Sequence, residues 1–123
     1  LLAKRKSIIT RYNEGLKDLD VSLLQHFGND WSSSGHLYLV RLNHFTAEQR
    51  NKVITKMAEK GVATNVHYKP LPMMTAYKAL GIDINNYPNA YHLYENEITL
   101  PLHTRLSEED VDYIIECLHE TLS

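Results

Sequence analysis

The sequence predicts an α+β domain in which helices pack on one face of a small three-stranded sheet. Three observations carry this prediction. Segments with helical spacing of apolar side chains alternate with short segments of strand composition. Ser107 and Thr46 each stand three residues before a side chain that can complete a capping box. The length of 123 residues suits one domain with its own hydrophobic core.

The N-terminal part is predicted to begin with a helix over residues 1–19, because Ile8, Tyr12, Leu16 and Leu19 recur at helical spacing. Residues 20–35 are less regular and contain two turn sequences, so we expect a loop or flap there. The chain starts without a methionine and already looks helical. This start indicates a piece of a longer protein.

The middle of the chain predicts a strand, a helix and a second strand. Residues 36–42 are apolar and aromatic, as in a buried strand. Thr46 caps the next helix with Gln49, and the helix runs to about Lys60, where Gly61 ends it in a left-handed conformation. Residues 62–67 form the second predicted strand. The two strands and their helix predict a right-handed crossover.

The last part adds helices and a third strand. A short helix is expected over about 73–80, ending at Gly81, and another from Pro88 to about Tyr94. Residues 97–101 form a strand that Pro101 stops, and Ser107 caps the final helix. We expect the strand over 97–101 to lie between the other two and to run antiparallel to both.

Composition excludes several classes of protein. Charged residues make up 23% and the net charge is −2, which offers no positive surface for nucleic acid or an anionic membrane. No apolar run approaches the roughly 20 residues of a membrane span, and no signal peptide is visible. The single cysteine, Cys117, is expected to be buried and structural. It fits a reducing compartment, and we expect a cytoplasmic protein.

Most catalytic motifs are missing from the sequence. The seven histidines have no metal-ligand spacing, and the glycines form neither a phosphate loop nor a nucleophile elbow. The most unusual segment is residues 67–72, where His67, Tyr68 and Lys69 precede two prolines. Two rings with polar tips at a strand end suit ligand contact. A capped strand whose Tyr68 packs on the sheet edge is the alternative reading.

Residues 61–71 also resemble a known family. The run Gly-Val-Ala-Thr-Asn-Val-His-Tyr-Lys-Pro-Leu is similar to the GI-x-T-x-x-HY-x-PL segment of the DegT/DnrJ-type sugar aminotransferases. Five further blocks resemble the family in the same order: the helix with Arg5, Tyr12 and Leu16, then residues 36–41, 87–90, 98–102 and 106–111. Pro72 stands where the family often has a histidine. Whether this sequence makes the substrate contact of that histidine is left open.

The resemblance implies the C-terminal small domain of a fold-type I enzyme that depends on pyridoxal phosphate. Residues 1–123 would be one domain, with an N-terminal helix over 1–19 and an α/β core over 36–123, cut from a longer aminotransferase. The family's large domain carries the Schiff-base lysine and most phosphate contacts. Lys69 belongs to the His-Tyr motif and is not that lysine. We therefore expect no cofactor-binding, metal-binding or catalytic residue in this chain, which alone would be inactive.

The implied parent transfers an amino group from an amino acid, expected to be glutamate, to the keto group of a nucleotide sugar. It would be a homodimer, with this domain beside the large domain of the same chain. His67, Tyr68 and Lys69 are the implied substrate-binding residues. The alternative is a free-standing α+β ligand-binding or regulatory module without catalysis, because this order of elements hosts many unrelated functions.

Overall fold

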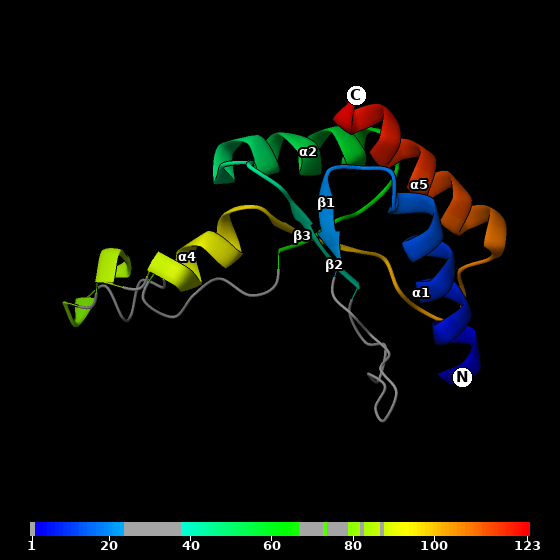
Figure 1. Ribbon diagram of the computed structural model, residues 1–123, viewed down its shortest axis with the longest axis horizontal. Coiled ribbons are helices and arrows are strands. Elements are labelled where there is room, and N and C mark those ends of the chain that lie inside the picture. The colour runs from blue at the N-terminus through cyan, green and yellow to red at the C-terminus, as the bar shows by residue number, and fades with distance from the viewer. Residues whose placement is uncertain (1, 24–37, 67–72, 74–78, 82, 87) are drawn as a thin grey trace.

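The computed structural model describes residues 2–23, 38–66, 73, 79–81, 83–86 and 88–123 (Figure 1). The elements along the chain are α1 (Leu2–Leu16), β1 (Val21–Leu23), β2 (Tyr38–Leu42), α2 (Ala47–Glu59), the 3₁₀ turn η2 (Ile84–Asn86), α4 (Pro88–Glu95), β3 (Glu97–Leu100) and α5 (Glu108–Leu122). Figure 1 shows α1, α2 and α5 gathered on one side of the sheet, while α4 extends away from them. The predicted fold class is confirmed.

The sheet is antiparallel and has the order β1-β2-β3. On the other side of β3, Asn65 forms an isolated antiparallel bridge with Thr99. Thr99 therefore lies between Leu39 of β2 and Asn65. This confirms the prediction that residues 97–100 lie between the other two segments and run antiparallel to both.

Two expectations about the sheet were wrong. Residues 21–23, which we expected in a loop, form the edge strand β1, because Val21 and Leu23 turn toward the core while Ser22 is exposed. Three residues are too short for an alternating pattern to stand out in the sequence.

Residues 62–66 make one bridge rather than a strand. The Val62 amide donates to the Met57 carbonyl at 2.9 Å, so the chain is still capping α2 at that point. In the register set by Asn65 and Thr99, residue 63 would face Pro101, which has no amide hydrogen to donate. Residue 67, the end of the predicted strand, lies outside the described residues.

The helix ends follow the capping signals. The Thr46 and Ser107 hydroxyls accept from the amides of Gln49 and Asp110, and both reciprocal bonds are present. Gly61 has φ 83°, the predicted left-handed conformation, and so does Gly81. Helix α1 ends at Leu16 rather than residue 19, because the Leu19 amide bonds to the Leu16 carbonyl in a tighter turn. Most of the short helix predicted over 73–80 lies outside the described residues.

The core lies between the sheet and the helices α1, α2 and α5. It contains side chains from each of these elements: Ile8, Ile9, Tyr12 and Leu16 from α1, Tyr38, Val40, Leu42, Ile98 and Leu100 from the sheet, Val53 and Met57 from α2, and Val111, Ile114, Cys117 and Leu118 from α5. Cys117 is buried as predicted. Among the described helices, none has the length and apolar character to cross a bilayer.

Candidate functional site

The three predicted substrate-binding residues, His67, Tyr68 and Lys69, lie outside the described residues. The structure describes the chain up to Val66, and it describes the part of the sheet beside that point. The site is therefore built from its described surroundings.

The bridge between Asn65 and Thr99 sets the direction of the chain as it approaches residue 67. The Asn65 amide donates to the Thr99 carbonyl at 3.2 Å, and the Thr99 amide donates to the Asn65 carbonyl at 2.7 Å. Because this pairing is antiparallel, Val66 follows Asn65 toward the end of β3 that begins at Glu97. Groups near Glu97 are thus the described neighbours of the candidate site.

The face of the sheet turned away from the core carries polar side chains. Tyr38, Val40 and Leu42 point into the core, so the residues that alternate with them point to the opposite face. The partners of Leu39 and Arg41 in the neighbouring strands lie on that same face. We call this set the polar sheet face; it consists of Ser22, Leu39, Arg41, Asn65, Glu97 and Thr99.

The most enclosed groups of the polar sheet face are Glu97 and Thr99, which are 4% and 7% exposed. The Thr99 hydroxyl donates to Oε1 of Glu97 at 2.9 Å. A carboxylate so far from water needs hydrogen bonds to offset its desolvation. Glu97 is therefore held in place beside the end of the Asn65 bridge.

Behind this edge lies Arg50 of α2, which is 1% exposed. Its Nη1 donates to the carbonyls of Tyr94 and Glu97 at 2.6 and 3.2 Å. Its guanidinium carbon lies 4.7 Å from the centroid of the Tyr94 ring. The last carbonyls of a helix lack partners within it, so Arg50 completes the end of α4 and fixes the turn into β3.

Sequence reasoning missed Arg50, although a signal was available. Arg50 stands three residues before Val53 and seven before Met57, the buried stripe of α2. An arginine on that stripe indicates a buried cation with a specific partner. Glu97 and Thr99 were similarly visible, since they alternate with the buried Ile98 and Leu100.

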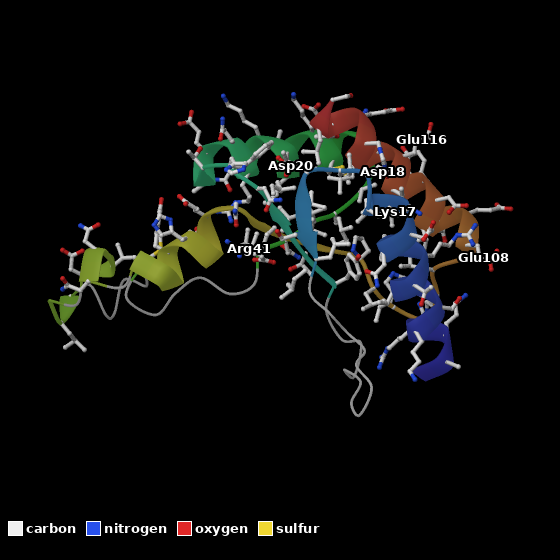
Figure 2. All side chains as sticks on the ribbon, in the orientation of Figure 1. Lys17, Asp18, Asp20, Arg41, Glu108 and Glu116 are labelled. Atoms are coloured by element: carbon white, nitrogen blue, oxygen red, sulfur yellow. The ribbon has the colours of Figure 1, made fainter. Side chains whose placement is uncertain are left out.

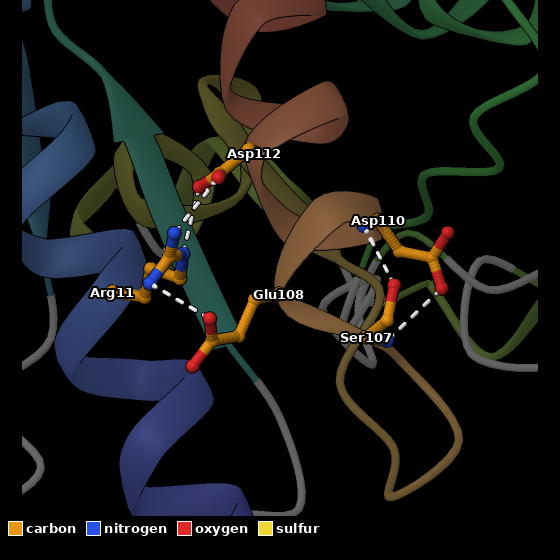
Figure 3. Close-up of polar contacts among 5 residues, drawn as sticks. All are labelled: Arg11, Ser107, Glu108, Asp110 and Asp112. Atoms are coloured by element: carbon orange, nitrogen blue, oxygen red, sulfur yellow. Dashed lines mark hydrogen bonds and ion pairs between the residues drawn. The ribbon is translucent and has the colours of Figure 1, made fainter.

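A second ionic contact lies away from this site and joins two helices. Arg11 of α1 donates from Nε and Nη2 to the two carboxylate oxygens of Asp112 at 2.7 and 2.8 Å (Figure 3). The hydrogen bond from Arg11 holds the pKa of Asp112 below its usual range, and Glu108 adds a longer contact at 3.7 Å. All three side chains are exposed. This cluster joins α1 to α5, and we interpret it as a contact that stabilises the fold.

The described residues supply no cradle for pyridoxal phosphate. Their lysines, at positions 4, 6, 17, 52, 56 and 60, are exposed or half-buried, whereas a lysine that carries the cofactor needs an enclosed pocket. Nor do any three His, Cys, Asp or Glu side chains within the described ranges gather closely enough to hold a metal ion. A shallow cavity of about 230 Å³ lies near Gly61, Pro101 and Tyr113, at the opposite end of the Asn65 bridge.

The fold and site thus define an α+β domain with helices on one sheet face and a polar second face. The sequence profile of the DegT/DnrJ/EryC1/StrS aminotransferase family matches residues 1–119. The chain belongs to this family.

Individual relatives agree with the family match. A putative sugar aminotransferase, Spr1654 from Streptococcus pneumoniae, is 51% identical over 98% of this chain and 30% of its own, with a TM-score of 0.95. It has been solved in PMP and PLP forms. A UDP-4-amino-4,6-dideoxy-N-acetyl-beta-L-altrosamine transaminase from Helicobacter pylori is 28% identical over 98% of this chain and 32% of its own length. The chain spans about a third of the curated relatives it matches.

Proposed function

We propose that this chain is the C-terminal small domain of a nucleotide-sugar aminotransferase. The parent would move an amino group from an amino acid, glutamate, to the keto group of a nucleotide sugar. The observation that carries the proposal is the family match over residues 1–119, in a chain that spans only about a third of its relatives. The Helicobacter pylori relative is described as a transaminase of a UDP-linked amino sugar. These findings favour a domain of an enzyme over a free-standing regulatory module.

Pyridoxal phosphate would act as the electron sink of the reaction. The large domain of the same parent chain would supply the lysine and the phosphate contacts, since the described residues offer no cradle for them. The parent would be a cytoplasmic homodimer. The 123-residue chain alone is expected to be inactive and to bind no cofactor, which absorbance of the purified chain mixed with pyridoxal phosphate would test.

Within that enzyme, we assign His67, Tyr68 and Lys69 to substrate contact. The support is the position of their neighbours: the Asn65 bridge directs the chain toward the end of β3 at Glu97, which is buried and fixed. Successive residues of a strand point to opposite faces, so His67 and Tyr68 can reach one sugar only if the strand ends before them. Pro70 favours that end, because it biases Lys69 toward an extended conformation and offers no amide.

The test uses the full-length enzyme with His67→Ala and Tyr68→Phe. Each change should lower kcat/KM for the keto-sugar by roughly fivefold or more, the loss of about 1 kcal/mol for one hydrogen bond. Cofactor absorbance should stay unchanged, because the lysine and phosphate contacts lie elsewhere. His103→Ala is a matched control, since His103 is exposed and on the loop before α5. Unchanged sugar kinetics in both variants would refute the assignment and favour the capped-strand reading.

A further inference from the structure

Arg41 is the only arginine among the six residues that define the polar sheet face. It lies in β2 directly opposite Glu97, and it is half-buried. Figure 2 marks it beside the end of α4, on the side of the sheet away from α1 and α5. In the register, the Arg41–Glu97 pair lies two residues from the Leu39–Thr99 pair, which adjoins Asn65. Arg41 is therefore close to the point where the chain leaves for residue 67.

Within the described residues, only one nitrogen of the Arg41 guanidinium makes a hydrogen bond. Its Nε donates to Oδ1 of Asn96 at 3.3 Å, a long hydrogen bond. Glu97, which faces Arg41 in the register, accepts a hydrogen bond from the Thr99 hydroxyl. Among the described residues, Nη1 and Nη2, which carry four N–H donors, have no partner.

Two other arginines show what a satisfied guanidinium looks like in this fold. Arg11 donates two hydrogen bonds to the two carboxylate oxygens of Asp112. Arg50 donates to Asn51 and to two backbone carbonyls, and its guanidinium carbon lies over the Tyr94 ring. Arg41 has neither arrangement. Its Nε donates to Asn96, and within the described part of the chain its two outer nitrogens have the arrangement that suits a planar oxyanion and no partner.

We propose that Arg41 binds an oxyanion, a carboxylate or a phosphate, carried by a substrate of the parent enzyme. The assignment of this oxyanion to a substrate rests on the proposed function. In that function the amino-acid donor carries carboxylates and the nucleotide sugar carries phosphates. The nearby Glu97 carboxylate limits the net positive charge of this face. Recognition therefore depends on the two-pronged geometry of the fork, which a lysine cannot reproduce.

The test measures binding rather than turnover, on the full-length protein. Calorimetric titrations use glutarate, a dicarboxylate without the reactive amino group, and inorganic pyrophosphate. The variants are Arg41→Gln and Arg41→Lys, with Arg105→Gln as the control because Arg105 is an exposed arginine outside the sheet. Thermal unfolding of each variant shows that it is folded.

Wild-type protein and the Arg105→Gln control should bind at least one probe, and Arg41→Gln should weaken that binding by about tenfold or more. Arg41→Lys should fold and still bind weakly. A loss confined to glutarate assigns the site to the amino-acid donor, and a loss confined to pyrophosphate assigns it to the nucleotide sugar. Wild-type affinity in Arg41→Gln or Arg41→Lys, or no binding of either probe to the wild type, overturns the inference.

The same titrations separate this inference from the proposed function. If the full-length protein binds a probe through Arg41 but does not transfer amino groups, the proposed function fails and the oxyanion site stands. If it transfers amino groups and Arg41→Gln leaves both affinities unchanged, the proposed function stands and the oxyanion site fails.

Discussion

The rings of Tyr12 and Tyr38 lie with their centroids 4.6 Å apart and their planes tilted by 35°. Tyr12 comes from α1 and Tyr38 from β2, and both are fully buried. The Tyr12 hydroxyl donates to the Pro101 carbonyl at 2.6 Å, and the Tyr38 hydroxyl donates to Oδ1 of Asn13 at 2.6 Å. The pair thus joins the first helix to the sheet through both packing and hydrogen bonds.

This pair should make the fold sensitive to alkaline pH. Burial raises the pKa of both phenols above the ordinary value. The folded state therefore holds these protons more tightly than the unfolded state, so their stabilisation is complete below pH 10 and is lost as the pH rises above it. Denaturant unfolding at pH 8 and pH 11 should show a lower free energy of unfolding at pH 11. In the Tyr12→Phe/Tyr38→Phe double variant the loss should be smaller, and an equal loss would contradict the explanation.

Gly15 should resist substitution because α5 lies against it. A Cβ atom at Gly15 would stand 2.6 Å from Cδ1 and 2.9 Å from Cγ2 of Ile115. Gly15→Ala should therefore destabilise the protein by about 1 to 3 kcal/mol through overpacking, despite the better helix propensity of alanine.

A double-mutant cycle tests that reason for Gly15. Ile115→Ala removes the atoms that would clash, so Gly15→Ala should cost less in the Ile115→Ala background. Urea unfolding of the four proteins gives the coupling free energy. Additive effects of the two substitutions would rule out the steric explanation.

Much of this fold could be predicted from local signals. Neighbouring residues determine the capping boxes at Thr46 and Ser107 and the left-handed conformation of Gly61. These features could therefore be predicted from short stretches of sequence. The central position of β3 was predicted from the crossover rule together with the apolar pattern of the strand. Strand β1 was missed because three residues gain their strand conformation from pairing with β2, a contact distant in sequence.

The candidate site was predicted less completely. The His67–Tyr68 motif was found through its composition and its resemblance to a family, and it stays a prediction. The place of Arg50 on the buried stripe of α2 was a local signal that was overlooked, whereas its partners, the carbonyls of Tyr94 and Glu97 more than forty residues away, could not be read from the sequence. Arg41 looked like a member of a buried strand, and only the register showed which face it occupies.

The N-terminal cap of α5 should contribute measurable stability. The Ser107 hydroxyl accepts from the Asp110 amide at 3.0 Å, so Ser107→Ala should lower the free energy of unfolding by about 1 kcal/mol. Ser7→Ala is the control, because Ser7 is exposed within α1 and makes no cap. Thermal and denaturant unfolding at pH 7 measure both variants. Equal stability of wild type and Ser107→Ala would show that the cap is unimportant.

The same cap should weaken in acid. The hydrogen bond from the Ser107 amide lowers the pKa of Asp110 below its ordinary value of 3.8. The contribution of this carboxylate is therefore present above about pH 4 and is lost as the pH falls through the lowered pKa. Asp110→Asn should reduce the difference in stability between pH 6 and pH 3. An unchanged pH dependence in that variant would contradict the role assigned to Asp110.

Arg50 should be the most sensitive polar residue of the described core. Arg50→Met keeps an unbranched, flexible stem but removes the guanidinium, which leaves the carbonyls of Tyr94 and Glu97 without their donor. Because each buried unsatisfied group costs about 1 to 3 kcal/mol, we expect a loss of about 2 to 4 kcal/mol in the free energy of unfolding. Arg50→Lys retains the charge but lacks the fork, and it should recover only part of this loss.

The location of the damage distinguishes this account of Arg50 from a general loss of packing. Arg50 ties the end of α4 to the start of β3, so amide hydrogen exchange in Arg50→Lys should rise first around Tyr94 to Glu97. Exchange in α1 and α5 should change less, since their contacts with each other do not involve Arg50. Met57→Ala is the matched comparison, because it opens the same helix face without removing a donor. Exchange that rises equally throughout the core in Arg50→Lys would show that Arg50 serves packing alone.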